Sequence, residues 1–232
     1  MSLLKSHQHR CQCGATLELK VAESVNAGRH PHLRDAILDG TLHRYRCDVC
    51  ARDIVLEREM FYFDFARKQF FCVFPVADLA RAADKARETA ELFDRVVQRE
   101  GPEVVRAAAD QFFVRACFGY DELREKLLCD EHRLSDLALE HLKLRVMISD
   151  PRFAQHSIGT LWLARVDEAQ RLWFHPAPLE PGVSFPPVVI ERAIYDDVAA
   201  PGDGALYNAR PALASGPHVS LLRLVRWAAS GS

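Results

Sequence analysis

The sequence predicts an α+β protein with an N-terminal β-unit, a central helical region and a small C-terminal antiparallel β-sheet. Strand-like alternation surrounds two close cysteine pairs near the N-terminus. Apolar residues then recur at helical spacing through the middle of the chain, and short strand-like segments separated by turns return in the last third. We therefore expect three parts, spanning residues 1–75, 76–150 and 151–232.

The first part is expected to be mostly strand. Leucine and valine alternate with polar residues between Ala15 and Ala22, as in a half-buried strand. Pro31 suits the first turn of a short helix that ends near Gly40. Further strands are expected at residues 41–46 and 52–59, and a hairpin at 61–74 with its turn at 66–68.

Four helices are expected in the second part. Apolar residues trace one helical face from Leu79 to Val97, and a second face from Val105 to Ala116 that Gly119 ends. Asp121 can cap a third helix over 122–129, and Ser135 a fourth that Asp150-Pro151 stops.

The third part is expected to return to strands. A hairpin is predicted at 161–166 and 171–175, with its turn at 167–170. Further strands are predicted at 188–195 and 219–227, with a long loop over 199–217 between them.

Length, composition and charge narrow the class of protein. The chain has 232 residues, of which 49% are apolar and 27% charged, as in an ordinary globular protein. A net charge of −2 argues against a general nucleic-acid binder. No signal-peptide core opens the chain and its apolar runs are too short to cross a bilayer, so we expect a cytoplasmic protein without a membrane partner.

The two cysteine pairs carry the clearest chemical signal. Cys11 and Cys13 form a Cys-x-Cys motif, and Cys47 and Cys50 form a Cys-x-x-Cys motif. In the cytoplasm, close cysteine pairs bind metal more often than they form disulfides. Four thiolates complete the tetrahedron that Zn²⁺ prefers and leave no position for a reacting water, so a structural zinc site is predicted in a zinc-ribbon-like unit.

Details of the two turns leave alternatives open. Gly14 follows the first pair and permits the positive φ that a knuckle turn needs, whereas Ala51 fits the corresponding position less well. His7, His9 or His43 lies close enough in sequence to replace a cysteine ligand. The alternative to a metal site is a degenerate ribbon with two reduced, packed thiol pairs. The other three cysteines, Cys72, Cys117 and Cys129, fall on apolar faces and are expected to be buried and inert.

The cysteine motifs and their surroundings resemble the bacterial CpXC-domain proteins. The similarity includes the segment His30–Leu42 between the motifs, the aromatic run Phe61–Asp64 and the helical run Phe118–Leu127. It covers about residues 1–150, although the first motif is one residue shorter than the family pattern and neither motif keeps its proline. The resemblance implies the zinc site and the fold, and it assigns no activity.

No catalytic motif accompanies these features. The chain contains no nucleophile elbow, P-loop, dinucleotide-binding glycine motif or His-Glu-x-x-His. We therefore expect no enzymatic activity, and interpret the chain as a zinc-binding module that contacts a protein partner or a second copy of itself.

Two other functions remain open at this point. The cysteine spacing is similar to that of the zinc centre in the redox-regulated heat-shock chaperone, in which oxidation expels zinc. Alternatively, basic and aromatic residues near the knuckles, such as Arg10, Arg44 and Tyr45, would suit nucleic-acid binding.

Overall fold

The computed structural model describes residues 2–151, 153, 158–178, 184–202 and 210–223. The chain divides into two compact units, Met1–Leu123 and Arg124–Ser232, with the division inside helix α4 (Tyr120–Glu131). The mixture of helices and sheets confirms the predicted α+β class.

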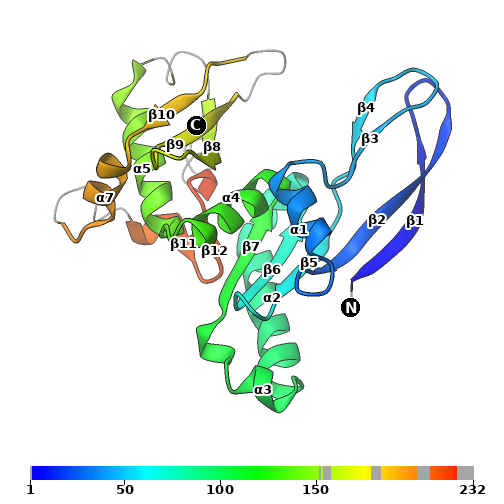
Figure 1. The fold of residues 1–232 in the computed structure, drawn as a ribbon, viewed down its shortest axis with the longest axis horizontal. Helices are drawn as coiled ribbons and strands as arrows, with labels where there is room; N and C mark the ends of the chain where they lie inside the picture. Colours follow the sequence, from blue (N-terminus) through cyan, green and yellow to red (C-terminus); the bar gives the residue numbers. More distant parts are fainter. Residues whose placement is uncertain (1, 152, 154–157, 179–183, 203–209, 224–232) are drawn as a thin grey trace. The chain divides into compact units, whose positions relative to one another are not determined.

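A five-stranded mixed sheet organises the first unit (Figure 1). Its order is β1-β2-β5-β6-β7, with β1 antiparallel to β2, β2 parallel to β5, β5 antiparallel to β6 and β6 parallel to β7. The strands are β1 (Leu3–Arg10), β2 (Thr16–Asn26), β5 (Met60–Asp64), β6 (Gln69–Phe74) and β7 (Phe113–Phe118). The predicted hairpin at 61–74 is confirmed, with Lys68 at φ +54° in its turn.

Strand β1 was missed by the sequence pattern. Its side chains are exposed or half-buried along its whole length, so it lacks the apolar alternation that marks β2. Pairing with β2 from Leu3 to Arg10 makes it a strand, and this antiparallel hairpin brings the chain back at the first cysteine pair. The partner strand therefore decides the structure of this segment.

A second, short hairpin carries the other cysteine pair. Its strands are β3 (Arg44–Arg46) and β4 (Asp53–Val55), which lie within the predicted strands 41–46 and 52–59 but are shorter. The Tyr45 hydroxyl donates to the carbonyl of Lys20 in β2 at 2.6 Å. In Figure 1 the β1–β2 and β3–β4 hairpins extend together beyond the rest of the sheet.

Aromatic side chains fill the core beside β5, β6 and β7. Tyr62, Phe71 and Phe118 are buried, and Phe93 of α2 packs edge-on against Phe70 with ring centroids 5.3 Å apart. The predicted face from Leu79 to Val97 extends over η1 (Val76–Arg81), α2 (Ala82–Phe93) and η2 (Asp94–Arg99). The predicted first helix is α1 (Pro31–Leu38), followed by Gly40 at φ +67°.

The helix predicted from Val105 to Ala116 is wrong. The chain forms the short helix α3 (Glu103–Arg106), a 3₁₀ turn at Ala109–Gln111 and then strand β7. All six residues of β7 pair in parallel with β6, and Ala116, Cys117 and Phe118 are buried. A short apolar run fits a buried strand as well as a helix, and here sheet pairing overrides the helical spacing.

Two helices begin the second unit. The predicted helix over 122–129 is part of α4, and the fourth predicted helix is α5 (Asp136–Ser149). The Ser135 hydroxyl accepts a hydrogen bond from the backbone N–H of Ala138, which confirms the predicted N-cap.

A three-stranded antiparallel sheet completes the second unit, in the order β10-β9-β8. The predicted hairpin is confirmed by β8 (Ile158–Val166) and β9 (Leu172–Pro178), and β10 is Val188–Ile190. The strand predicted over 188–195 is wrong beyond Ile190, because helix α7 (Arg192–Ala199) follows. Its Tyr195 side chain is buried, and the tyrosine hydroxyl accepts from the N–H of Ser135.

Short elements lie mostly within the predicted loop 199–217. They are η4 (Arg210–Leu213), β11 (Ala214–Ser215) and β12 (His218–Val219). Of the described residues 219–223 of the last predicted strand, only Val219 is in a strand. Residues 224–227 of the predicted strand 219–227, and part of the loop predicted over 199–217, lie outside the described residues. Within the portion of the chain that the structure describes, no helix has the length and apolar character needed to cross a membrane.

Candidate metal centre

Two turns bring the four cysteines together. Cys11 and Cys13 lie in the turn between β1 and β2, and Cys47 and Cys50 lie in the turn between β3 and β4. The four sulfur atoms all lie within 4.8 Å of one another. The structure therefore assembles the predicted set of ligands from segments more than 30 residues apart.

The distances between the sulfurs fit a tetrahedral metal ion. Cys11 Sγ lies 3.7 Å from Cys50 Sγ, and Cys13 Sγ lies 3.7 Å from Cys47 Sγ. Metal–sulfur bonds of about 2.3 Å in a regular tetrahedron place the sulfurs about 3.8 Å apart. The cluster can thus hold one four-coordinate ion without a large rearrangement.

In both turns, a backbone hydrogen bond joins the carbonyl of the first cysteine to the N–H of the residue after the second cysteine. The N–H of Gly14 donates to the carbonyl of Cys11 at 2.9 Å, and the N–H of Ala51 donates to the carbonyl of Cys47 at 2.8 Å. Gly14 has φ +92° and Ala51 has φ +54°. The second turn therefore places an alanine in a left-handed backbone conformation, at the position where the first turn has glycine.

Local amides and neighbouring thiols tune two of the sulfurs in opposite directions. The N–H groups of Cys50 and Val49 lower the pKa of the Cys47 thiol to about 7. For Cys13, the largest effect is the N–H of Ala15, which lowers the pKa, but the thiols of Cys11 and Cys50 together raise it to about 11. Amides directed at sulfur are what a thiolate ligand needs, because they stabilise its negative charge.

Little apolar burial supports the two turns. Cys11, Cys47 and Ile54 form a small buried cluster, with Ala15, Leu17 and Tyr45 packed against it. Cys13 and Cys50 are exposed. A cluster of this size contributes little hydrophobic free energy, so a bound ion would supply much of the stability at this end of the unit.

The three nearby histidines do not join the cysteines. His43 is buried; its Nε2 accepts from the N–H of Ala22 at 2.8 Å, so its ring proton lies on Nδ1 and is donated to the Tyr120 hydroxyl at 2.6 Å. His7 contacts Arg58 instead. Among the described residues, the ligand atoms that converge with these sulfurs come from cysteines alone, so His9 is outside the cluster as well.

The contact between His43 and Tyr120 was not expected from the sequence. It links the loop before β3 to the start of α4, and the Tyr120 hydroxyl also accepts from the N–H of Arg58 at 3.2 Å. The residues are 77 positions apart, and no local pattern pairs them. Burial lowers the pKa of His43 to about 4, which keeps the ring neutral in this position.

The remaining cysteines are buried apart from the cluster, as predicted. Cys72 lies in β6, Cys117 in β7 and Cys129 in α4. Burial raises the pKa of Cys72 to about 12 and that of Cys129 well above its usual range, so both thiols stay protonated.

The fold and the cluster define a class: an α+β protein whose two N-terminal hairpins share a four-cysteine centre able to hold a metal ion. A family model described as "CpXC protein" matches residues 10–143, more than half of the chain and all four cysteines. The chain belongs to the CpXC family. Comparison with curated proteins and with solved structures found no match.

Proposed function

We propose that this protein is a non-enzymatic zinc-binding module in which Zn²⁺ on Cys11, Cys13, Cys47 and Cys50 holds two hairpins together for contact with a protein partner. The observation that carries the proposal is the convergence of four sulfurs with tetrahedral spacing. Four thiolates fill the coordination sphere of zinc, so the ion supplies folding energy and not a reactive water.

The small core beside the cysteines supports a structural role. Zinc binding to such a site contributes on the order of 10 kcal/mol, which is large compared with the burial of one isoleucine and two cysteines. Removal of the ion is therefore expected to unfold the hairpin tips while the sheet around β6 and β7 keeps its aromatic core.

Metal analysis and amide exchange test this proposal together. We expect one zinc per chain, with zinc lost in Cys13→Ser and retained in Cys72→Ala, which removes a buried cysteine outside the cluster. After chelation, the N–H groups of Gly14 and Ala51, which close the two turns, should exchange at least about tenfold faster. Unchanged protection at both amides after zinc loss would contradict a structural role.

A redox-sensitive zinc switch is a second candidate, favoured by the exposure of Cys13 and Cys50. One hydrogen peroxide molecule would take two electrons from a pair of thiolates, which then form a disulfide, while the peroxide takes two protons from solvent and becomes two waters. The ion would be released once both pairs have reacted. The short distances favour the pairs Cys11–Cys50 and Cys13–Cys47. Mass spectrometry and a zinc-release assay at millimolar peroxide check this, and intact zinc would exclude it.

Nucleic-acid binding has less support. Four arginines are exposed around the hairpin tips, namely Arg10, Arg44, Arg46 and Arg52. Exposed Glu18, Asp48 and Asp53 lie on the same hairpins, and a zinc ion with four thiolates adds about two negative charges. These charges leave no basic surplus at the tips, and a salt-dependent gel shift would test the point.

A further inference from the structure

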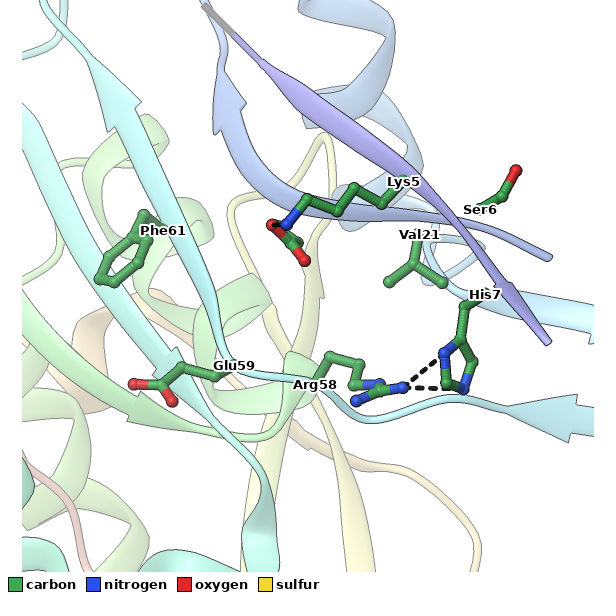
Figure 2. Close-up of a pocket in the computed structure, with 8 residues that line it drawn as sticks. Lys5, Ser6, His7, Val21, Arg58, Glu59 and Phe61 are labelled. Atoms are coloured by element: carbon green, nitrogen blue, oxygen red, sulfur yellow. Dashed lines mark hydrogen bonds and ion pairs between the residues drawn. The ribbon is translucent and has the colours of Figure 1, made fainter. Parts of the chain in front are cut away.

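A solvent-open hollow of about 590 Å³ lies in the first unit, between the β1–β2 hairpin and residues 58–61 (Figure 2). Strand β1 supplies Lys5 and His7 to its wall, β2 supplies Val21, and the chain entering β5 supplies Arg58 and Phe61. Its size is in the range of ordinary ligand sites. None of these residues belongs to the four-cysteine cluster.

One side of the hollow carries a cation that has no anionic partner among the described residues. Arg58 Nη2 lies 2.7 Å from His7 Nδ1, and within the described residues no carboxylate lies within ion-pair distance of Arg58. Figure 2 shows the guanidinium and the imidazole meeting at the edge of the hollow. Lys5 instead pairs with Glu23 at 2.7 Å. Arg58 is therefore the group best placed to receive a carboxylate from outside the chain.

Apolar surface lies next to this cation. Val21 is 4% exposed and projects into the hollow in Figure 2, while Phe61 is 39% exposed on the opposite side from His7. An exposed phenylalanine on a strand of a hydrophobic sheet offers an anchor for an apolar side chain. The hollow thus places a binding site for one negative charge beside a site for an apolar group.

Two carboxylates limit what can enter. Glu23 and Glu59 both line the hollow. Glu59 Oε1 also lies 3.9 Å from Nζ of Lys85, which is not among the lining residues. A phosphate or a nucleic-acid backbone brings more than one negative charge, so it meets more repulsion from these two carboxylates than a single peptide carboxylate does. Lys5 beside Glu23 and Lys85 beside Glu59 offset part of that repulsion for either ligand.

We propose that this hollow binds an extended peptide segment of a partner protein, with an aspartate or glutamate side chain on Arg58 and an apolar side chain on Phe61. The proposal rests on the interaction function proposed above and gives it a surface. The peptide carboxylate would replace His7 as the main acceptor beside Arg58, because an ionised acceptor forms the stronger hydrogen bond.

The four-cysteine cluster would prearrange the walls of this site. Strand β1 carries Lys5 and His7 and ends just before Cys11. After Cys50 the chain forms β4, and Arg58 lies three residues beyond the end of that strand. An ion that ties the two turns together therefore limits how far these two walls can separate. Peptide affinity is expected to fall when the ion is removed, because the free protein must then order both walls on binding.

An amide-shift titration by NMR tests the proposal on the full chain. The probe is acetyl-Leu-Asp-Leu-amide, and its isosteric control is acetyl-Leu-Asn-Leu-amide. We expect the aspartate peptide to shift amides within residues 5–7, 21–23 and 58–61, and the asparagine peptide to bind at least about tenfold more weakly. Arg58→Gln should lose the same factor, whereas Arg29→Gln, which removes an exposed charge outside the hollow, should bind as the wild type does.

Several results would overturn this assignment. Equal binding of the two peptides, or unchanged binding by Arg58→Gln, would remove the carboxylate contact. Stronger shifts of the same amides by inorganic phosphate would make the hollow a general anion site. Zinc content measured on the same sample separates the two proposals. A zinc-loaded protein that does not bind the peptide overturns only the peptide site, and a protein that is purified without zinc and binds the peptide overturns only the structural zinc site.

Discussion

Ala51 occupies a left-handed backbone conformation, with φ +54°, in the turn between Cys47 and β4. An L-residue with a Cβ atom pays about 1 kcal/mol for this conformation, and glycine avoids that cost. The corresponding position in the first turn is already glycine, Gly14. The strain at Ala51 is therefore local to the second turn.

We predict that Ala51→Gly tightens zinc binding about fivefold, because the relaxed turn presents Cys47 and Cys50 without strain. Competition against a chromophoric chelator measures the affinity. Ala66→Gly is the matched control, since Ala66 lies exposed in the distant β5–β6 turn. Weaker zinc binding by Ala51→Gly would show that flexibility in the turn outweighs the relief of strain.

His43 gives the first unit a defined dependence on pH. Its pKa is about 4 in the folded chain, against an ordinary value of 6.5, because burial disfavours the charged ring. The unfolded state therefore binds the proton more strongly between these two values. Stability from this residue is complete above pH 6.5 and decreases as the pH falls from 6.5 toward 4, by roughly 2 kcal/mol after allowance for solvent screening.

Unfolding free energies at pH 7, 6, 5 and 4 check this prediction for the wild type and for His43→Asn. Asparagine tolerates the positive φ of this position and does not titrate. Both proteins keep the four cysteines, so the pH dependence of metal binding cancels in the difference. Parallel pH profiles for the two proteins would contradict the assigned role of His43.

Single elements of the fold show where local patterns suffice. Helix α5 begins at the predicted capping serine, and we expect Ser135→Ala to destabilise the second unit by about 1 kcal/mol. Urea unfolding measures this change, and Ser149→Ala at the other end of the helix should have little effect. Equal effects of the two substitutions would argue against the cap.

Strands β1 and β7 show where local patterns fail. The apolar spacing of Val105–Ala116 also fits a helix, and only the parallel ladder with β6 makes residues 113–118 a strand. Strand β1 has no apolar face of its own and is defined by β2. Both errors concern edge strands. The partner of β7 is distant in sequence, and β1 has no apolar signal of its own, so a local pattern identifies neither strand.

At the scale of the whole molecule, charge is buried in the core of the second unit. Glu125, Lys126, Glu140 and Lys143 are fully buried on α4 and α5. Lys143 Nζ lies 2.8 Å from both Glu125 Oε1 and Glu140 Oε1, and Glu140 Oε2 accepts from the N–H of Leu221 at 2.7 Å. Lys126 Nζ donates to the carbonyl of Val219 at 2.7 Å, so this cluster joins both helices to the end of β12 and the residues that follow it.

The two glutamates respond differently to this environment. Burial raises the pKa of Glu125 to about 7, although Lys143 opposes the shift. Burial also disfavours the charge of Glu140, but Lys143 and Lys126 together hold its pKa below the ordinary value. Glu140 is therefore the ionised centre of the cluster. Its removal would leave Lys126 paired with Asp136 and Lys143 paired with Glu125, whose raised pKa makes it a weaker anion.

We predict that Glu140→Ala destabilises the second unit by about 3–5 kcal/mol, because removing one member of a buried ion pair leaves the charge of its partners poorly compensated. Denaturant unfolding gives the free energy, and faster exchange of the Leu221 amide locates the change. Glu131→Gln, at an exposed position on α4, serves as the control. A loss below about 1 kcal/mol would mean that the lysines find other partners.

The sequence by itself determined the cysteine set, the α+β class and the helices whose caps and apolar spacing are local, such as α1 and α5. The cysteine pairs can be recognised in the sequence because each turn supplies two ligands that are a few residues apart. Only the tertiary structure decided the Arg58 hollow, the His43–Tyr120 contact and the buried charges around Glu140. Each of these joins side chains from segments far apart in the chain, and their chemistry arises from desolvation and proximity, which no local pattern of residues records.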